Sequence, residues 1–322
     1  MASCMASSLF LKHLLLVVAL PLLISSTPAP GCHDSIISFG DSLADTGNLL
    51  HLSSSDGRPT EAGFLPYGET YFHRPTGRFS DGRLVIDFVA EWLGLPYVAP
   101  YYGDDGGRSV ADFGKGVNLA VAGATALDAG FFEGRGMGNS FPNESLGVQL
   151  GLFKELLPSL CNTSSGNFPI GCLPVYLTEF QSSDKEEYDP LTGCLNWLNE
   201  FSQYHNEQLQ RRLDHLRELH PRANIIYVDY YNAALRFYQS PDKFGFDGGI
   251  LSACCGGGGT YNYNLSALCN SNARVCDDPS SYASWDGIHF TEAAYRWIFK
   301  SMADGSCTVP KLDISCPSVA FE

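Results

Sequence analysis

The sequence is short of positive charge. Its 322 residues include 20 lysines and arginines against 35 aspartates and glutamates, which gives a formal net charge of -15. A protein that follows nucleic-acid phosphates needs a basic surface, so this composition argues against a nucleic-acid partner. It also provides no electrostatic attraction to an anionic membrane. Hydrophobic residues make up 44% of the chain and charged residues 17%, which is ample material for a folded core.

The apolar stretch near the N-terminus, residues 14–24, is too short to cross a membrane. Its length at about 1.5 Å per residue falls well below a hydrocarbon core of about 30 Å, and Pro21 interrupts it. Lys12 precedes the stretch, and small residues and prolines follow it. This order is typical of a secretory signal peptide. Residues 1–30 therefore predict a secreted, extracellular protein without a transmembrane anchor.

Paired C-x-x-C motifs are absent, although the chain contains 11 cysteines. Cys4 would leave with the signal peptide, and the ten that remain are an even number in an oxidising compartment. This favours disulfides over a structural zinc site and leaves their pairing open. Three Asn-x-Ser/Thr sequons fit export, with N-glycans expected at Asn143, Asn162 and Asn264.

No internal repeat and no long low-complexity linker follows residue 30, so residues 31–322 are predicted to form a single domain. Short β-rich segments are expected at 35–39, 116–123 and 225–228, and helices at 83–93, 195–219 and 291–298. A helix followed by a buried strand is typical of an α/β fold with a parallel sheet.

The helix at 195–219 carries apolar residues spaced by three and four positions. They are Leu198, Phe201, His205, Leu209, Leu213 and Leu216. This spacing predicts a single stripe that packs on the core, with His205 as a core histidine.

Strand patterns are missing between Gly123 and Ile225, about a hundred residues. An α/β domain of this length is expected to show more strands at that density.

The first candidate for chemistry is Gly40-Asp41-Ser42, at the end of the expected strand 35–39. A serine hydroxyl needs a neighbouring base and a fixed position to act as a nucleophile. A strand that ends in this tripeptide and turns into a helix would give that position, and the helix N-terminus would bring backbone N–H groups close to a developing oxyanion. An ordinary β-turn has the same composition.

The second candidate is Asp286-Gly287-Ile288-His289, which precedes the last expected helix. It puts a carboxylate three residues before a histidine. Such an aspartate can hold the tautomer of the histidine and stabilise its protonated form. A capping aspartate and a surface histidine would explain either residue alone, but not both together with a glycine that allows the turn.

The sequence resembles the plant secreted GDSL esterase/lipases, a family of SGNH hydrolases. The resemblance covers nearly the whole chain after residue 30, in order. It rests on the blocks 39–48 (FGDSLADTGN), 78–83 (RFSDGR), 118–124 (NLAVAGA), 168–174 (FPIGCLP), 253–259 (ACCGGGG) and 286–289 (DGIH).

This resemblance implies an α/β fold, the SGNH three-layer sandwich with a parallel sheet. It implies Ser42 as nucleophile, with Asp286 and His289 as its partners. The oxyanion hole would use the backbone N–H groups of Ser42 and Gly123, together with an asparagine side chain from a Gly-x-Asn-Asp block. The substrates would be small-molecule or lipid esters, and no cofactor or metal would be needed.

The Gly-x-Asn-Asp block is absent from this sequence. In the family a strand ending in Gly-Asn-Asp, a helix and a further strand separate segments like 156–161 and 166–169, whereas only residues 162–165 join them here. The expectation is an internal truncation around 161–166 that removes central strands. An inactive or poorly folded chain, acting at most as a non-catalytic binding protein, is the alternative.

The four glycines after Cys254-Cys255 invite comparison with a phosphate-binding loop. No Lys-Ser/Thr pair follows them, so a loop tied by disulfides is expected instead.

Overall fold

The structure is a computed structural model that describes residues 35–55, 57, 60–103, 115–134, 143–156, 164–165, 167–219, 221 and 225–311. The expected signal peptide lies outside these residues, as do the sequon at Asn162 and three cysteines, Cys32, Cys161 and Cys316.

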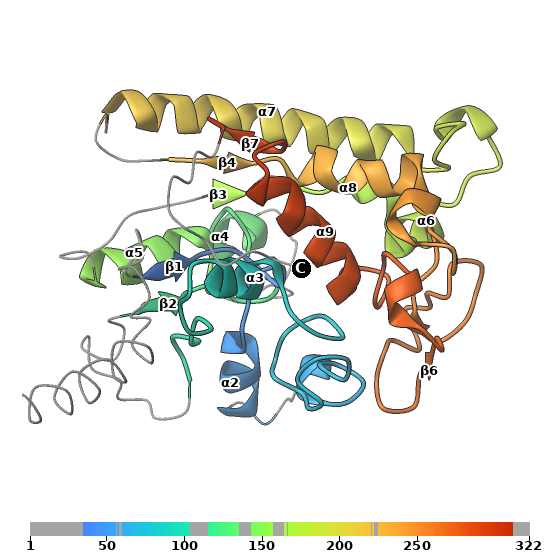
Figure 1. The fold of residues 1–322 in the computed structure, drawn as a ribbon, viewed down its shortest axis with the longest axis horizontal. Coiled ribbons are helices and arrows are strands. Elements are labelled where there is room, and N and C mark those ends of the chain that lie inside the picture. The colour runs from blue at the N-terminus through green and yellow to red at the C-terminus, as the bar shows by residue number, and fades with distance from the viewer. Residues whose placement is uncertain are drawn as a thin grey trace, which may run out of the picture.

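The described chain is a mixed α/β structure with a small parallel sheet (Figure 1). The helices are α2 (Asn48–Ser55), α3 (Val85–Trp92), α4 (Ala129–Glu133), α5 (Leu146–Leu156), α6 (Pro174–Glu179), α7 (Asn196–Leu219), α8 (Tyr230–Gln239) and α9 (Glu292–Ala303). The strands are β1 (Ile36–Ser38), β2 (Gly116–Asn118), β3 (Ser164–Ser165), β4 (Tyr227–Val228), β5 (Cys255–Gly256), β6 (Arg274–Val275) and β7 (Thr308–Val309).

Two separate groups of strands contain the parallel pairings. β1 pairs with β2 in parallel, and Gly116 of β2 is opposite Ile36. A Cβ on Gly116 would lie 1.9 Å from the Ile36 carbonyl oxygen, so only glycine permits this approach. β3 pairs in parallel with β4, and β4 pairs antiparallel with β7. No pairing joins the two groups within the described residues.

Three helices contribute much of the core next to the site. α9 packs against both α3 and α8, and Phe88 of α3 stacks on Phe299 of α9 with ring centroids 5.8 Å apart. Asp229 and Thr291 are the N-cap residues of α8 and α9, and their side chains accept hydrogen bonds from backbone N–H groups three residues on. The predicted helices at 83–93, 195–219 and 291–298 are confirmed, as are the predicted strands.

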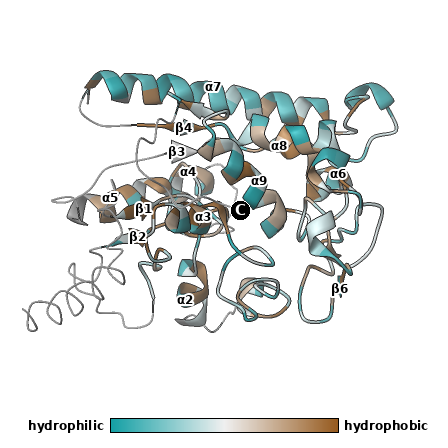
Figure 2. Cartoon of the chain, in the orientation of Figure 1, coloured by the Kyte–Doolittle hydropathy of each residue, from teal (hydrophilic) through white to brown (hydrophobic). Residues whose placement is uncertain are grey.

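The buried face of α7 differs from the predicted stripe. Phe201 is 56% exposed, and His205 is exposed rather than a core histidine. The buried positions are Leu198, Asn199, Ser202, Asn206 and Leu213. Asn206 lies inward because it exchanges two hydrogen bonds with the backbone of Asn167, at 2.6 and 2.9 Å. Figure 2 shows the largely hydrophilic colouring of α7 along one edge of the molecule.

Three disulfides confirm the preference for disulfides over zinc. They are Cys172–Cys194, Cys254–Cys276 and Cys255–Cys269, while Cys307 is free and buried. The loop after Cys254-Cys255 is therefore tied by disulfides, as expected.

The stretch between Gly123 and Ile225 is poor in strands, as predicted. Within its described residues the single strand is the two-residue β3.

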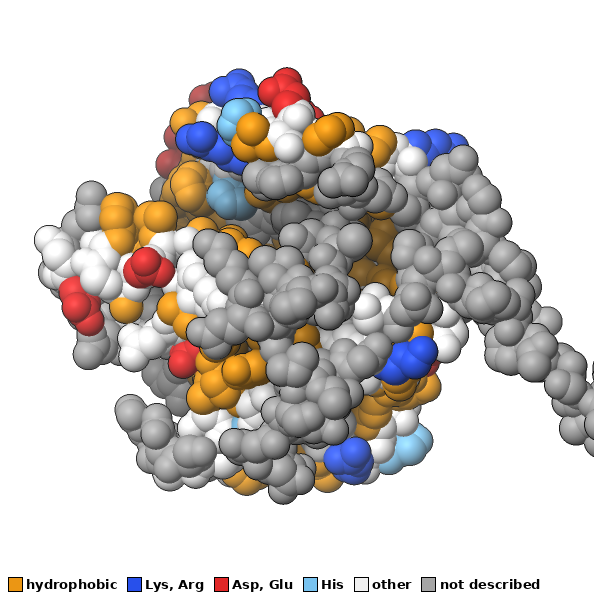
Figure 3. Space-filling model, turned by 90° about the vertical axis from the view of Figure 1, so that its left-hand side faces the viewer, with side chains coloured by type: hydrophobic (Ala, Val, Ile, Leu, Met, Phe, Trp, Pro, Cys, Tyr) orange, Lys and Arg blue, Asp and Glu red, His pale blue; other side chains and the backbone are white. Residues whose placement is uncertain are grey.

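The surface carries charges of both signs. Figure 3 shows acidic and basic side chains interspersed with hydrophobic ones on one face. Asn143 and Asn264, in two of the three sequons, are exposed. None of the described helices is both long and apolar enough to cross a membrane.

Candidate active site

Ser42 lies in a turn that begins where β1 ends. Gly40, two residues earlier, has a φ of +136°, which glycine adopts without steric cost. The buried side chain of Gln149 in α5 holds this residue from both sides. Its Oε1 accepts from Gly40 N at 2.9 Å, and its Nε2 donates to Gly40 O at 2.8 Å. The backbone before the serine is therefore fixed by a helix that is distant in the sequence.

The expectation that a helix begins at Ser42 is wrong. The chain makes a single turn, closed by Asp45 N donating to Asp41 O at 3.0 Å, and α2 starts only at Asn48. The physical reason is that the Asp45 side chain accepts hydrogen bonds from the first N–H groups of α2 and so starts that helix separately. The N-terminus of α2 does not lie at the serine.

The carboxylate of Asp45 also joins the serine turn to the loop after β2. It is fully buried. It accepts four backbone hydrogen bonds of 2.5–3.0 Å, from Gly47, Asn48, Leu49 and Ala122. Burial raises the pKa of Asp45, although these hydrogen bonds act in the opposite direction. Because Ala122 precedes Gly123, Asp45 fixes the backbone of Gly123 relative to the serine.

The structure brings Ser42, His289 and Asp286 together. Ser42 Oγ lies 2.8 Å from His289 Nε2, and His289 Nδ1 lies 2.7 Å from Asp286 Oδ2. His289 and Asp286 are buried. An ionised carboxylate can only accept, so Nδ1 carries the hydrogen and Nε2 of the neutral ring accepts from the serine hydroxyl. A serine hydroxyl held in this way can lose its proton to the histidine as it attacks a substrate.

The Asp286 carboxylate receives four hydrogen bonds. Oδ1 accepts from the backbone N–H groups of Ile288 and His289, at 2.9 and 2.8 Å. Oδ2 accepts from His289 Nδ1 and from the hydroxyl of Tyr67, at 2.7 and 2.8 Å. Burial raises the pKa of Asp286, but the charge of His289 and the hydrogen bonds from His289 and Ile288 outweigh it. The pKa of Asp286 therefore lies below that of an ordinary aspartate.

The segment 78–83 holds the start of α9 next to the histidine. The ring of Phe79 packs against His289 with centroids 4.8 Å apart. Asp81 Oδ1 accepts from Glu292 N at 2.8 Å, and the Arg83 guanidinium donates to Glu292 Oε1 at 2.8 Å. These contacts fix the first turn of α9, three residues after His289.

The glycine between the aspartate and the histidine permits the turn. Gly287 has a φ of +95°, and a Cβ on it would lie 2.3 Å from the ring of Tyr263. Its carbonyl oxygen accepts from Val175 N at 3.0 Å, next to the start of α6. The residue that follows the segment 168–174 is therefore hydrogen-bonded to the turn that carries Asp286.

Gly123 lies in an exposed position after β2 with a φ of +82°. The structure describes no hydrogen bond from the backbone N–H of Gly123 or of Ser42 to another group. Both N–H groups are therefore left free by their described neighbours, as donors to a substrate oxygen must be.

The sequence interpretation missed Gln149, Asp45 and Tyr67. Asp45 lies inside the block 39–48, so its closeness to Ser42 in the sequence could have indicated a role beside the serine. Gln149 and Tyr67 act from 109 and 219 residues away from their partners, and nothing in their local sequence marks that contact. Within the described part of the chain, no three His, Cys, Asp or Glu side chains gather as a metal site requires.

The chain belongs to the GDSL-like Lipase/Acylhydrolase family. The sequence profile of this family matches residues 36–164 and 162–302. The chain is 46% identical to the GDSL esterase/lipase At1g28610 of Arabidopsis thaliana, over 88% of this chain and 89% of that protein. It is 48% identical to At1g28590 of the same plant, over 88% and 85% of the two chains. It is 43% identical to the sinapine esterase of Brassica napus, over 92% of each.

Proposed function

We propose that this chain is a serine hydrolase that cleaves carboxylic esters through an acyl-enzyme on Ser42. The observation that carries the proposal is the continuous line of contacts from Ser42 Oγ through His289 to Asp286, at 2.8 and 2.7 Å. The relatives support the substrate class, because they are named esterases or lipases.

In the proposed reaction, Ser42 Oγ attacks the ester carbonyl carbon while its proton passes to His289 Nε2. Asp286 stabilises the protonated imidazole through Nδ1. The tetrahedral intermediate expels the alcohol, which takes the proton from His289. Water then attacks the acyl-enzyme with His289 as base, which releases the carboxylic acid and restores Ser42.

The backbone N–H groups of Ser42 and Gly123 would hold the oxyanion. Their free donors and the anchoring of the Gly123 loop by Asp45 support this role. A third donor from a Gly-x-Asn-Asp block has no counterpart in the sequence. Loss of one such donor typically lowers the rate about 10²–10³-fold. The expected activity is therefore weak rather than absent.

We also propose that the chain is an internally truncated SGNH hydrolase whose three-layer sandwich lacks central strands. The family profile matches in two segments that meet at residues 162–164. The alignment with At1g28610 spans 346 positions, and 88% of 322 residues, about 283, take part in it. Roughly 60 positions are therefore unmatched in this chain, and the two unpaired groups of strands fit their loss at this point.

The truncation is tested on the messenger RNA. A transcript in which only the codons of residues 162–165 separate that of Cys161 from that of Gly166 supports a genuine short variant. If every transcript contains a further segment there, the truncation belongs to the gene prediction and the proposal is withdrawn.

We further propose that residues 1–30 direct secretion, that residues 31–322 form a single domain, and that Asn143, Asn162 and Asn264 carry glycans. Three disulfides and the exposure of Asn143 and Asn264 support an extracellular location. Exported protein that still begins at residue 1 would contradict the signal peptide.

The hydrolase proposal is tested with a fluorophosphonate probe and a short-chain nitrophenyl ester. We expect the exported protein to be labelled and to turn over the ester, and Ser42→Ala to lose both. Ser54→Ala removes an exposed hydroxyl from the end of α2 and serves as the matched control, with unchanged labelling. A folded protein that reacts with neither reagent would instead be a non-catalytic binding protein.

A further inference from the structure

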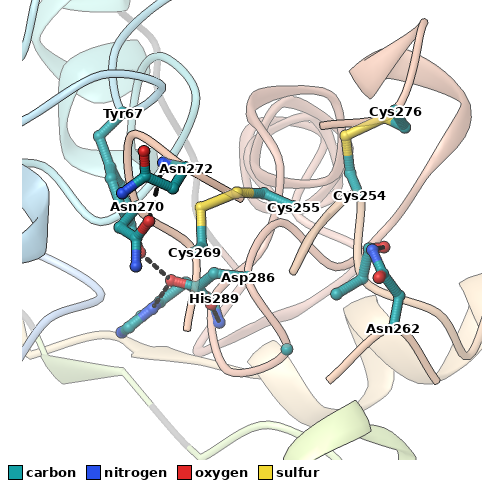
Figure 4. The surroundings of a disulfide bond; sticks show 12 residues. Tyr67, Cys254, Cys255, Asn262, Cys269, Asn270, Asn272, Cys276, Asp286 and His289 are labelled. Carbon is teal, nitrogen blue, oxygen red and sulfur yellow. Dashed lines mark hydrogen bonds and ion pairs between the residues drawn. A yellow bond between two sulfur atoms is a disulfide. The ribbon is translucent and has the colours of Figure 1, made fainter. Parts of the chain in front are cut away.

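Tyr67 reaches the candidate acid from a distant part of the chain. It lies in the loop after the short 3-10 helix η1 (Glu61–Gly63), and its hydroxyl is 2.8 Å from Asp286 Oδ2. The side chain is 3% exposed and packs edge-on against Phe79 and Trp285, with centroids 6.0 and 6.1 Å away. Figure 4 shows Tyr67, Asp286 and His289 next to one another. The hydroxyl is therefore fixed by packing as well as by its hydrogen bond.

The hydroxyl can act there only as a donor. Burial, and after it the negative charge of Asp286, raises the pKa of Tyr67 well above its ordinary value. The phenol therefore keeps its proton at pH values at which an ordinary tyrosine begins to ionise. It shares Oδ2 with the Nδ1–H of His289, whereas Oδ1 is occupied by two backbone donors.

We propose that Tyr67 is a positioning residue that takes the place of water at Asp286 Oδ2 and thereby limits how strongly Asp286 holds the protonated form of His289. This inference rests on the proposed function, in which His289 must give its proton to the leaving alcohol. A carboxylate in a buried site is a stronger proton acceptor when it has fewer donors. The hydroxyl of Tyr67 is the fourth donor to this carboxylate. It stabilises the ionised form of Asp286 and so limits how strongly the carboxylate attracts a proton.

Tyr67 also connects the two aromatic contacts of the site. Its ring touches Phe79, and Phe79 packs against the imidazole of His289. The next residue, Gly68, donates its N–H to Ser80 O at 3.0 Å, so the loop of Tyr67 and the segment 78–83 are joined along the backbone. The hydroxyl and the ring therefore orient the aspartate and the histidine together.

The test is Tyr67→Phe, which keeps the ring and removes the donor. We expect the acid limb of the pH profile of kcat/KM to move up by about half to one pH unit, because the more basic Asp286 retains the protonated histidine to a higher pH. We expect kcat to fall about three- to tenfold with KM nearly unchanged, since the buried hydroxyl faces the aspartate. Tyr238→Phe, which removes an equally buried hydroxyl that lacks a described partner, is the matched control. An unmoved acid limb would overturn the inference.

A measurement without substrate separates this inference from the proposed function. The Nδ1–H proton between His289 and Asp286 gives a low-field proton resonance, and we expect Tyr67→Phe to shift it in a Ser42→Ala background. If the resonance shifts but the wild-type protein hydrolyses no ester, the coupling stands and the hydrolase proposal fails. If the resonance does not shift, the role of Tyr67 is overturned whatever the activity.

A second replacement covers the case in which Tyr67→Phe does not fold. 3-Fluorotyrosine at position 67 keeps the hydrogen bond and makes the hydroxyl a stronger donor, so the acid limb should move to lower pH. A movement to higher pH would contradict the inference.

Discussion

Three carboxyl groups near the site differ in their hydrogen-bond partners, and their pKa values differ accordingly. Asp286 has a lowered pKa because His289 and two backbone donors outweigh its burial. Asp45 has a raised pKa in spite of four backbone donors, because the effect of its burial is larger than theirs. Burial raises the pKa of Asp81 to about 6, and the nearby negative charge of Glu292 contributes in the same direction. The balance between burial and hydrogen-bond partners thus decides the direction in which the pKa of each carboxyl group moves.

The raised pKa of Asp81 predicts that the folded state loses stability as the pH rises from about 4 to about 6. In the folded chain its pKa is about 6, whereas an unfolded aspartate titrates near 3.9, so the folded state binds more protons between these values. Stability therefore falls by up to about 3 kcal/mol across this window and is level above it. We expect Asp81→Asn to remove this fall.

The measurement is the melting temperature of wild type and Asp81→Asn at pH 4 to 7. The advantage of the wild type over the variant should shrink by several degrees as the pH rises through this window. Asp304→Asn changes an exposed aspartate and should leave the difference constant. A difference for Asp81→Asn that does not depend on pH would show that this carboxyl group titrates normally.

At the scale of elements, the segment of β5 supports the residues that lead into Asp286. Cys254 N donates to Ser284 O at 3.0 Å, and Cys255 N donates to Trp285 O at 2.7 Å. Disulfides tie both cysteines to the loop that contains β6. The backbone just before Asp286 is thus hydrogen-bonded to Cys254 and Cys255, which disulfides hold to the loop that contains β6.

Removing the Cys255–Cys269 disulfide should affect both stability and labelling. This bond closes a loop with a sequence separation of 14, so we expect Cys255→Ser/Cys269→Ser to lose about 3 kcal/mol of stability. Labelling of Ser42 by the probe should slow at a temperature where the variant is still folded. The control is Cys172→Ser/Cys194→Ser, which opens a loop of separation 22 and should lower the melting temperature with a smaller effect on labelling. Equal labelling rates in both variants would contradict a role for β5 at the site.

The elements also show what could be predicted from the sequence. The strand before Ser42 and the helix after His289 followed from local patterns, because their apolar spacing and caps lie within a few residues. The inward face of α7 did not. The stripe counted Phe201 and His205 as buried, whereas contacts with a segment about 40 residues earlier place Asn206 inside. A polar residue with a distant backbone partner is not visible to a periodicity argument.

At the scale of the whole molecule, the sequence predicted the α/β class and the region that is poor in strands. It named Ser42, Asp286 and His289 from two short motifs, because each motif carries its own turn. It did not identify Gln149 or Tyr67, since their partners lie more than a hundred residues away. Tertiary contacts of this kind depend on how distant segments meet, which local residue patterns do not encode.

Ser42 and His289, the two side chains that we propose to react, are 247 residues apart in the sequence. A ribosome therefore adds the serine 247 residues before the histidine. Under the proposed mechanism, a nascent chain carries a nucleophile without its base until the segment that contains His289 has been made. The same holds for a prematurely terminated product or an N-terminal proteolytic piece. Assembly of the proposed site thus depends on two segments that are made at different times and must then fold together.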